Sequence, residues 1–454
     1  MGITVNTAGL MSSSGFDVQG LADTMMEAAA APEQAWKNQQ TTLSGQTSAL
    51  NQLSSDLSSV NSSVQSLTDV LGAFAQRTAS SSDSGIVSAT ATTAATVGQH
   101  TVTVTSLATK AVYYSDTSVA TGDTALSGGS MTVTVGSNIQ TVSIGGSTNT
   151  LNTLAKKING LNMGVTASVI TDTSGAKLAL VSNNTGKASD ISLTTTADSA
   201  LTFTKSSDGA DAVASVDGIP VTSANNVISN VIPGLTLNLN GQLPGSPVTV
   251  SVEANADGVT QAVTDFVNAY NALTSDINAQ FTYDSTSGSS GVLAGDSTVR
   301  TVQEELMQAV SGINVSNSGT PTLGSLGITM NDDGTLSLDS STLNAALSSQ
   351  FSDVQTFFQD PTQGFATQLG TLMTSLSDPV NGAFVVDLQG ITNTQTGLTN
   401  DINNFEANLA LQRQQLVTQL TQANDALEAL PNQLNEINAE LGSLSNSSSN
   451  NKSS

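Results

Sequence analysis

The chain has 454 residues, of which only 10% are charged, and its formal net charge at pH 7 is −25. So acidic a chain repels a nucleic-acid backbone and an anionic membrane, which excludes both as binding partners. The absence of cysteine excludes disulfides, thiolate nucleophiles and cysteine-based metal sites, and the length leaves room for about two to four domains.

No conventional cleaved signal peptide is expected at the N-terminal segment. A cleaved signal peptide needs a basic region before an apolar core, but the first basic residue is Lys37. No apolar run approaches the roughly 18–20 residues that span a bilayer, so we expect a soluble protein without membrane insertion. Residues 1–15 are small and polar and are expected to be disordered, and Asp17 is a candidate N-cap for a short helix.

A long helix is predicted after Pro32, which suits the first turn of a helix. From Leu50 onward, apolar residues recur at alternating steps of three and four, which places them on one stripe, as in the seam of a coiled coil. Gln39 and Gln46 fill two positions of this seam with polar side chains. At 1.5 Å per residue the helix would be roughly 55–60 Å long, a length typical of a stalk. The apolar seam residues are Trp36, Leu43, Leu50, Leu53, Leu57, Val60, Val64, Leu67, Leu71 and Phe74.

The middle of the chain is predicted to be β-rich, because the apolar period changes to two after Phe74. Turns are expected at Gly136–Asn138, Asp172–Gly175 and Asp217-Gly218. One short helix interrupts the strands and carries Leu151, Leu154, Ala155 and Ile158 on one face. The expected strands include residues 101–105, 131–135, 139–144, 165–170, 177–181, 213–216, 235–239 and 248–252.

Helical spacing returns towards the C-terminus. Asp257 and Asp296 are candidate N-caps of two helices, and a hairpin is expected around Asp332-Asp333-Gly334. Two further helices are indicated by apolar residues at helical spacing, namely Leu343, Leu347, Phe351 and Val354 on one and Phe365, Leu369, Leu372 and Leu376 on the other.

A second apolar seam closes the chain, with Arg413 in one of its positions. Pro431 removes a backbone donor and crowds the carbonyl of Leu427, so a kink or break is expected there. The Ser/Asn-rich residues from Gly442 to Ser454 are expected to be disordered. Both seams are too apolar to face water, so the two ends of the chain pack together or pack into neighbouring subunits. The apolar residues of the second seam are Leu409, Leu416, Leu420, Ala423, Leu427, Leu430, Leu434, Ile437 and Leu441.

No arrangement of residues points to catalysis. His100 is the only histidine and is assigned a structural role. The Asp332-Asp333-Gly334 segment fails as a calcium loop, because Ser340 stands where the bidentate glutamate belongs. There is no Ser/His/Asp order, phosphate-binding glycine loop or evident carboxylate pair. We therefore predict no catalytic, cofactor or metal site and no enzymatic activity.

The order of segments resembles that of the bacterial flagellar filament cap proteins, also called hook-associated protein 2. The resemblance rests on short stretches spread over nearly the whole chain. They are Gly15–Leu21, Pro32 with Gln39-Gln40 and Ser48–Leu50, Leu151–Asn159, Leu180–Gly186, Ala262–Asn271, Leu326–Thr329, Asp333–Asp339 and Phe357-Phe358.

The resemblance implies an α+β multidomain fold, with terminal coiled-coil helices and a helical stem that carries two inserted all-β head domains. Residues 1–40 and 395–454 would form the legs. Residues 41–75 and 256–394 would form the stem with its small hairpin. Residues 76–108 and 206–255 would form the inner head domain, into which an outer head domain of residues 109–205 is inserted.

The resemblance also implies a function in assembly. The protein would leave the cell through the flagellar type III channel and form a homo-oligomeric ring, a pentamer or hexamer, at the filament tip. There it would hold arriving flagellin while it folds and polymerises. Its other partners would be hook–filament junction proteins and, before secretion, an export chaperone. Because polar residues interrupt the outer seams, we expect the legs to be loose until they meet these partners.

Two alternative functions remain open at this stage. The chain could be another flagellar axial protein, such as a hook–filament junction protein. It could also be an extracellular adhesin whose Thr/Ser-rich head binds host glycans or mucin, although no aromatic cluster marks a sugar-binding platform.

Overall fold

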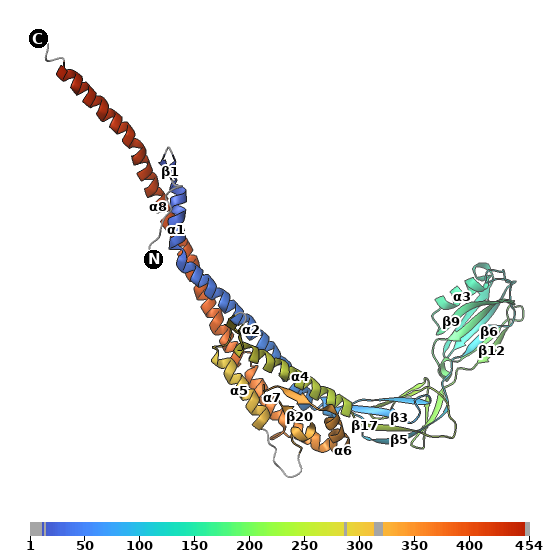
Figure 1. The fold of residues 1–454 in the computed structure, drawn as a ribbon. Coiled ribbons are helices and arrows are strands. Elements are labelled where there is room, and N and C mark those ends of the chain that lie inside the picture. Colours follow the sequence, from blue (N-terminus) through green and yellow to red (C-terminus); the bar gives the residue numbers. More distant parts are fainter. Residues whose placement is uncertain (1–10, 13–14, 286–287, 313–320, 450–454) are drawn as a thin grey trace. The chain divides into compact units, whose positions relative to one another are not determined.

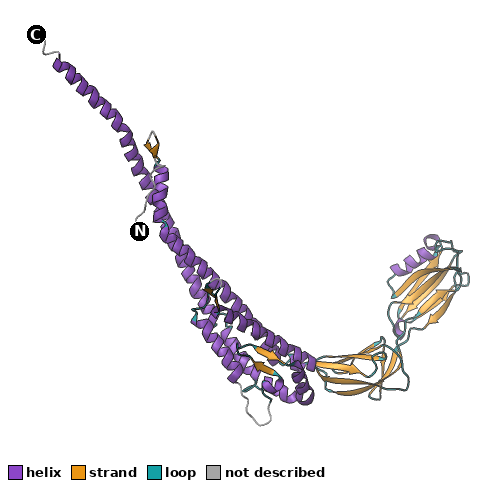
Figure 2. Cartoon of the chain, viewed as in Figure 1, coloured by secondary structure: helices purple, strands orange, loops and turns teal. Residues whose placement is uncertain are grey.

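The computed structural model describes residues 11–12, 15–285, 288–312 and 321–449. Its contacts divide the chain into two compact units. One, the helical unit, comprises Met1–Thr68, Val263–Leu343 and Thr356–Ser454; the other, the strand unit, comprises Asp69–Ala262 and Asn344–Gln355. Most helices (purple in Figure 2) belong to the first unit, and most strands (orange) belong to the second. The predicted mixture of terminal helices with a β-rich middle is confirmed.

The helical unit contains several long helices and three small hairpins. As predicted, the side chain of Asp17 caps α1 (Val18–Ala29) by accepting the N–H of Gly20. The other helices of this unit are α2 (Ala31–Thr68), most of α4 (Ala256–Phe281), α5 (Ser297–Gly312), α7 (Phe365–Leu376) and α8 (Ala383–Ser449). The first turns of α4, up to Ala262, and most of α6 (Ser340–Gln359) belong to the strand unit. The hairpins are β1 (Met11–Ser12) with β2 (Gly15–Phe16), β18 (Tyr283–Asp284) with β19 (Ser289–Ser290), and β20 (Ile328–Met330) with β21 (Leu336–Leu338).

Helix α2 follows the predicted seam but ends earlier than expected. Its 38 residues give a length of about 57 Å. After Thr68 the chain leaves the helix, and Leu71 is 74% exposed, so its assignment to the seam is wrong. Phe74 is buried, but it lies in the separate 3-10 helix Ala73–Ala75. The extended backbone of Gly72 interrupts the helical path between them.

Helix α8 corrects two expectations about the C-terminus. It continues through Pro431, so the predicted break is wrong. A proline removes only one hydrogen bond of the helix, and here Leu427, whose carbonyl loses that bond, is exposed to water. The helix also reaches Ser449, so the expected disorder is wrong for residues 442–449. Residues 450–454, and residues 1–10 and 13–14 of the expected N-terminal disorder, lie outside the described part.

The helix starts were predicted with mixed success. Asp296 caps α5 by accepting the N–H of Thr298 at 2.8 Å and of Val299 at 3.2 Å, as expected. Asp257, however, is not the cap of α4. That helix begins at Ala256, and the side chain of Asn255 accepts the N–H of Gly258 at 2.9 Å. Asp257 instead places its negative charge in the first turn, which suits the helix dipole.

The strand unit has two apolar clusters, each formed by two antiparallel sheets. In the first cluster a five-stranded sheet, ordered β14-β13-β5-β17-β3, lies with a three-stranded sheet, ordered β15-β16-β4. Buried residues alternate along β16 and β17, as the period of two requires. The strands are β3 (Arg77–Ser81), β4 (Val87–Ala91), β5 (Gly98–Ser106), β13 (Ala212–Val216), β14 (Ile219–Ser223), β15 (Val227–Ile232), β16 (Leu235–Leu239) and β17 (Val248–Ala254).

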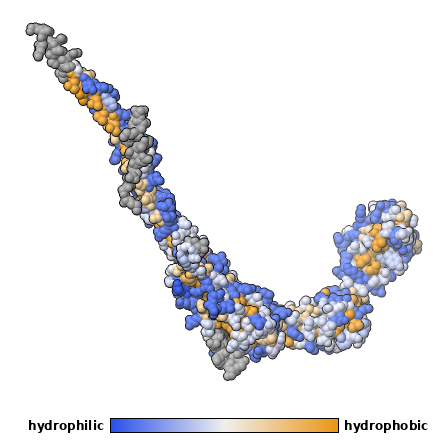
Figure 3. Space-filling model, in the orientation of Figure 1, coloured by the Kyte–Doolittle hydropathy of each residue, from blue (hydrophilic) through white to orange (hydrophobic). Residues whose placement is uncertain are grey.

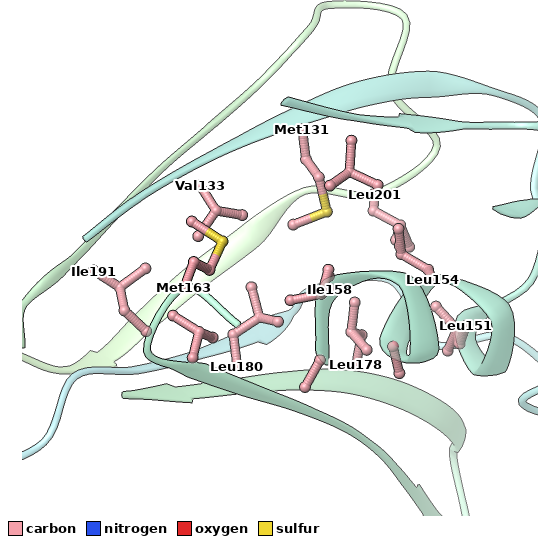
Figure 4. Packing of buried hydrophobic residues seen from close by; sticks show 14 of the residues in the cluster. Met131, Val133, Leu151, Leu154, Ile158, Met163, Leu178, Leu180, Ile191 and Leu201 are labelled. Carbon is pink, nitrogen blue, oxygen red and sulfur yellow. The ribbon is translucent and has the colours of Figure 1, made fainter. Parts of the chain in front are cut away.

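The second cluster joins a four-stranded sheet, ordered β12-β6-β10-β9, to a three-stranded sheet, ordered β11-β7-β8. The predicted helix is confirmed as α3 (Leu151–Gly160), and its four expected apolar residues are buried in this cluster. Figure 4 labels three of them, Leu151, Leu154 and Ile158. The hydroxyl of Thr150 caps the helix. The strands are β6 (Val112–Ser115), β7 (Gly129–Val135), β8 (Asn138–Ile144), β9 (Val165–Asp172), β10 (Gly175–Ser182), β11 (Ile191–Thr195) and β12 (Phe203–Ser207).

The predicted hairpin turns are also confirmed. Asp217 and Gly218 both have positive φ, 50° and 83°, as a type I′ turn requires between β13 and β14. The Asp332–Gly334 segment is a turn between β20 and β21, in which Asp333 accepts the N–H of Thr335 at 3.0 Å.

The second cluster offers a direct test of core packing. Leu178 of β10 is fully buried, whereas Ile170 of the neighbouring β9 is 58% exposed. We expect Leu178→Ala to lower the local free energy of unfolding by about 2–5 kcal/mol, because it leaves a cavity. The control Ile170→Ala should change it by less than about 0.5 kcal/mol. Amide hydrogen exchange in β9 and β10 measures both values, and equal effects would contradict this packing.

Candidate assembly surface

The two ends of the chain pack against each other as antiparallel helices. Gln40 of α2 donates to the hydroxyl of Thr399 of α8 at 2.9 Å, and Lys37 lies 3.3 Å from Glu406. Residue numbers thus rise along α2 as they fall along α8. Figure 1 shows α1 and α2 beside α8. Of the two arrangements left open by the sequence, packing of the ends within one chain is therefore present.

The contact between these helices is aromatic as well as aliphatic. Trp36 of α2 meets Phe405 of α8 edge to face, with ring centroids 5.1 Å apart. Leu398 and Ile402 of α8 are also buried. The predicted second seam starts at Leu409 and therefore lacks these three α8 residues. Continuing the alternation of three and four upstream from Leu409 would have found all of them.

The only two basic residues on α1, α2 and α8 both bridge the chain ends. Lys37 contacts Glu33 on its own helix and Glu406 on α8, and these carboxylates raise the pKa of Lys37. Arg413 lies 2.7 Å from Asp23 of α1. These side chains are partly exposed, so we assign them to fixing the register of the helices rather than to stability. The polar seam position of Arg413 thus has a cross-helix partner.

The inner half of the α2 seam faces the interior of the helical unit. Gly370 of α7 lies so close to α2 that a Cβ at this position would come within 3.3 Å of Val64 Cγ1. The carbonyl of Val292 accepts a hydrogen bond from Gln46 at 3.1 Å, so this polar seam residue also has a partner. The inner seam is therefore held by α7 as well as α8.

The predicted seam residues fall into three groups by exposure. The structure brings the first two groups into the packed interface and leaves the third uncovered. The buried residues are Leu50, Leu53, Leu57, Val60, Val64 and Leu67. The half-buried residues are Trp36, Leu43, Leu409, Leu416 and Leu420. The exposed residues are Ala423, Leu427, Leu430, Leu434, Ile437 and Leu441.

We call the uncovered part of α8 the terminal stripe; it comprises Leu427, Leu430, Leu434, Ile437 and Leu441. Each of these side chains is 48–59% exposed. Figure 3 shows hydrophobic residues along this end of α8. Acidic residues accompany the stripe, and α8 has no basic residue after Arg413. A continuous apolar stripe on an exposed helix marks an interaction surface, and its charge favours a partner with basic residues at the rim.

His100 belongs to a structural contact. Its Nδ1 lies 2.8 Å from Asp217 Oδ2, and Asp217 Oδ1 accepts the N–H of Thr101 at 2.8 Å. These bonds hold the pKa of Asp217 below its usual range and tie the Asp217-Gly218 turn to β5. Within the described residues, no group of three or more His, Cys, Asp or Glu side chains is placed to hold a metal ion. No described helix is long and apolar enough to cross a bilayer.

Comparisons with known proteins match most of the chain. A family model described as the C-terminus of flagellar hook-associated protein 2 matches residues 209–436, and one described as its N-terminus matches residues 14–111. The B-type flagellar hook-associated protein 2 of Pseudomonas aeruginosa is 31% identical over 416 residues, which cover 85% of this chain and 86% of that protein. Flagellar hook-associated protein 2 of Escherichia coli strain K12 is 30% identical over 471 residues, which cover 97% of this chain and 98% of that protein.

A solved structure is similar as well. The crystal structure of the D1-D2-D3 domains of the flagellar cap protein FliD from Escherichia coli superposes with a TM-score of 0.55 at 27% identity. The match covers 76% of this chain and 99% of that structure.

Two glycines provide a matched test of the packing between α2 and α7. At Gly370 a side chain would press on Val64, whereas at Gly390 of α8 a Cβ meets nothing within 4 Å. We expect Gly370→Leu to destabilise the helical unit by about 1–3 kcal/mol through overpacking. Gly390→Leu should be neutral or stabilise it by up to about 1 kcal/mol, because leucine favours a helix more than glycine does. Urea unfolding followed by circular dichroism measures both, and a stabilising Gly370→Leu would contradict the close contact.

Proposed function

Because the chain belongs to the flagellar hook-associated protein 2 family, we propose that it caps the tip of the growing flagellar filament, where it retains exported flagellin and promotes its folding and polymerisation. The observation that carries this proposal is the extent of the family match, which includes both terminal helices and the strands between them. The similar Escherichia coli structure is described as a flagellar cap protein. The family is one of structural proteins, and the proposed role needs no catalysis.

The terminal helices are the proposed attachment to the filament. The seam of α8 changes from buried at Ile402 to half-buried at Leu416 and exposed at Leu434. The packed part would hold the leg to the rest of the chain, and the terminal stripe would bind a partner, because apolar seam residues are stable only when covered. The proposed occupants are flagellin, hook–filament junction proteins or neighbouring copies of the chain. The export chaperone is the proposed partner before secretion.

We also propose the domain division and assembly that the resemblance implies. Legs of residues 1–40 and 395–454 would join a stem of residues 41–75 and 256–394. Residues 76–108 with 206–255 would form an inner head domain, and residues 109–205 would form an outer head domain inserted into it. The protein would be exported through the flagellar type III channel and would form a ring of five or six copies at the extracellular tip. Electron microscopy of the purified ring would count its subunits.

Secretion of flagellin tests the capping function. A strain that lacks this chain is expected to release unpolymerised flagellin into the medium and to swim poorly, and the wild-type gene should restore filaments. The double variant Leu434→Asp, Ile437→Asp should fold but fail to restore them, because two charges interrupt the terminal stripe. Flagellin in the medium and filament length under the microscope are the measurements.

The control variant is Leu411→Asp, because Leu411 lies on the same helix and is 59% exposed but is outside the seam. It should restore filaments like the wild type. A deletion strain that still retained its flagellin would contradict capping. If the double variant restored filaments fully, capping could stand, but the role of the terminal stripe would be wrong.

A further inference from the structure

Two pairs of half-buried aspartates face each other in the helical unit, and each pair joins a terminal helix to an inner one. Asp56 of α2 lies within hydrogen-bond reach of Asp276 of α4. Asp387 of α8 lies within hydrogen-bond reach of Asp296, the N-cap of α5. The same arrangement therefore occurs once on each of the two helices that continue into the chain ends.

The buried oxygens of these pairs lack a donor. Asp56 Oδ2 and Asp387 Oδ2 are inaccessible to solvent and have no hydrogen-bond donor. The other oxygen of Asp56 accepts the side-chain amide of Gln52 at 3.0 Å. Carboxylates only accept hydrogen bonds, so two of them can bond to each other only when they share a proton. Each pair thus has a place for one proton between its carboxyl groups.

No nearby cation replaces that proton. Among the described residues, none of the four carboxylates forms an ion pair. Helices α4 and α7 contain no basic residue. The one basic residue of α5, Arg300, lies over the ring of Phe281, 4.8 Å from its centre.

The basic residues of the terminal helices are also engaged elsewhere. Lys37 of α2 contacts Glu33 and Glu406, and Arg413 of α8 contacts Asp23. When both carboxyls of a pair lose their protons, two negative charges therefore face each other without compensation.

We propose that these two pairs make the packing of α2 and α8 depend on pH. In mildly acidic solution the shared protons hold α2 and α8 to the inner helices, and as the solution becomes neutral the loss of these protons releases them. This proposal concerns the helical unit of the free chain and does not depend on the capping function. It adds a second property to the terminal helices, namely that their attachment responds to pH.

The direction of the pH dependence follows from burial and repulsion. Burial raises the pKa of Asp56 to about 6, and the hydrogen bond and charge of Asp276 contribute in the same direction. Burial and Asp296 likewise raise the pKa of Asp387, and the opposing hydrogen bond from the side chain of Thr298 is weaker than their effect. The folded form therefore keeps protons that the unfolded form gives up above its ordinary pKa near 4. The stability that the protonated pair around Asp56 contributes is fully present below about pH 4, the ordinary pKa, and is lost as the pH rises through about 6.

Hydrogen exchange of the full-length wild-type chain tests the proposal without any variant. After correction for the intrinsic exchange rate, the opening constants of amides near Asp56 and Asp387 should rise by roughly tenfold to a hundredfold between pH 5 and pH 8, since one pKa unit corresponds to a factor of ten. Amides of α3, which is far from both pairs in sequence, should keep the same opening constants at the two pH values. Unchanged opening constants around both pairs would overturn the proposal.

Asparagine variants assign the effect to each pair. In Asp56→Asn the amide can donate to Asp276 at any pH, so α2 should lose its pH dependence while α8 keeps it. Asp387→Asn should show the reverse. The control Asp401→Asn changes an exposed aspartate of α8 and should keep the wild-type profile at both sites. If Asp56→Asn and Asp387→Asn kept the wild-type pH dependence, other groups would be responsible and the proposal would be wrong.

Discussion

The burial of one side of α2 is the constraint on which the rest of the helical unit depends. Six leucine and valine side chains from Leu50 to Leu67 lose almost all contact with water. Neighbouring segments of sequence cannot cover a seam of this length, so α7 and α8, from the other end of the chain, supply the cover. The closure entropy of a long loop grows only slowly with its length. A large strand-rich insertion between the paired helices therefore costs little stability.

The low charge content makes the few charged contacts specific. The surface of α2 is largely serine and threonine, whose hydroxyls donate to carbonyls of the preceding turn, as Ser58 does to Ser54 at 2.9 Å. Such local bonds do not select a partner helix. Lys37 and Arg413 do so instead, because each has its acidic partner on another helix at one register only. A helix pair with so few charges can fix its register and still present a largely apolar seam.

Helix α8 changes character along its length. Near Ile402 it belongs to the packed interior, and beyond Leu427 its seam faces solvent. The same heptad spacing thus has two physical outcomes in one helix. The terminal stripe gives the chain a surface for other proteins. The aspartate pairs, nearer the packed part of the unit, make the attachment of α2 and α8 to the inner helices depend on pH.

Local spacing in the sequence determined most of the secondary structure. Alternation of two predicted the strands of the middle region, and steps of three and four predicted α2 and α8, because these periods place apolar side chains on one face of each element. Sequence resemblance also indicated the family. The wrong predictions are the cap at Asp257, the seam position of Leu71 and the break at Pro431. They lie at helix ends or at exposed positions, where the local sequence alone does not decide the conformation.

Only the tertiary structure decided which faces meet. Trp36 and Phe405 are far apart in the sequence, as are Asp56 and Asp276, and no local pattern links either pair. For this reason no carboxylate pair is evident in the sequence. The apolar period shows that a helix has an apolar side. Which of its residues are buried, share a proton or stay uncovered depends on the helix that packs against it, and that helix comes from a distant part of the sequence.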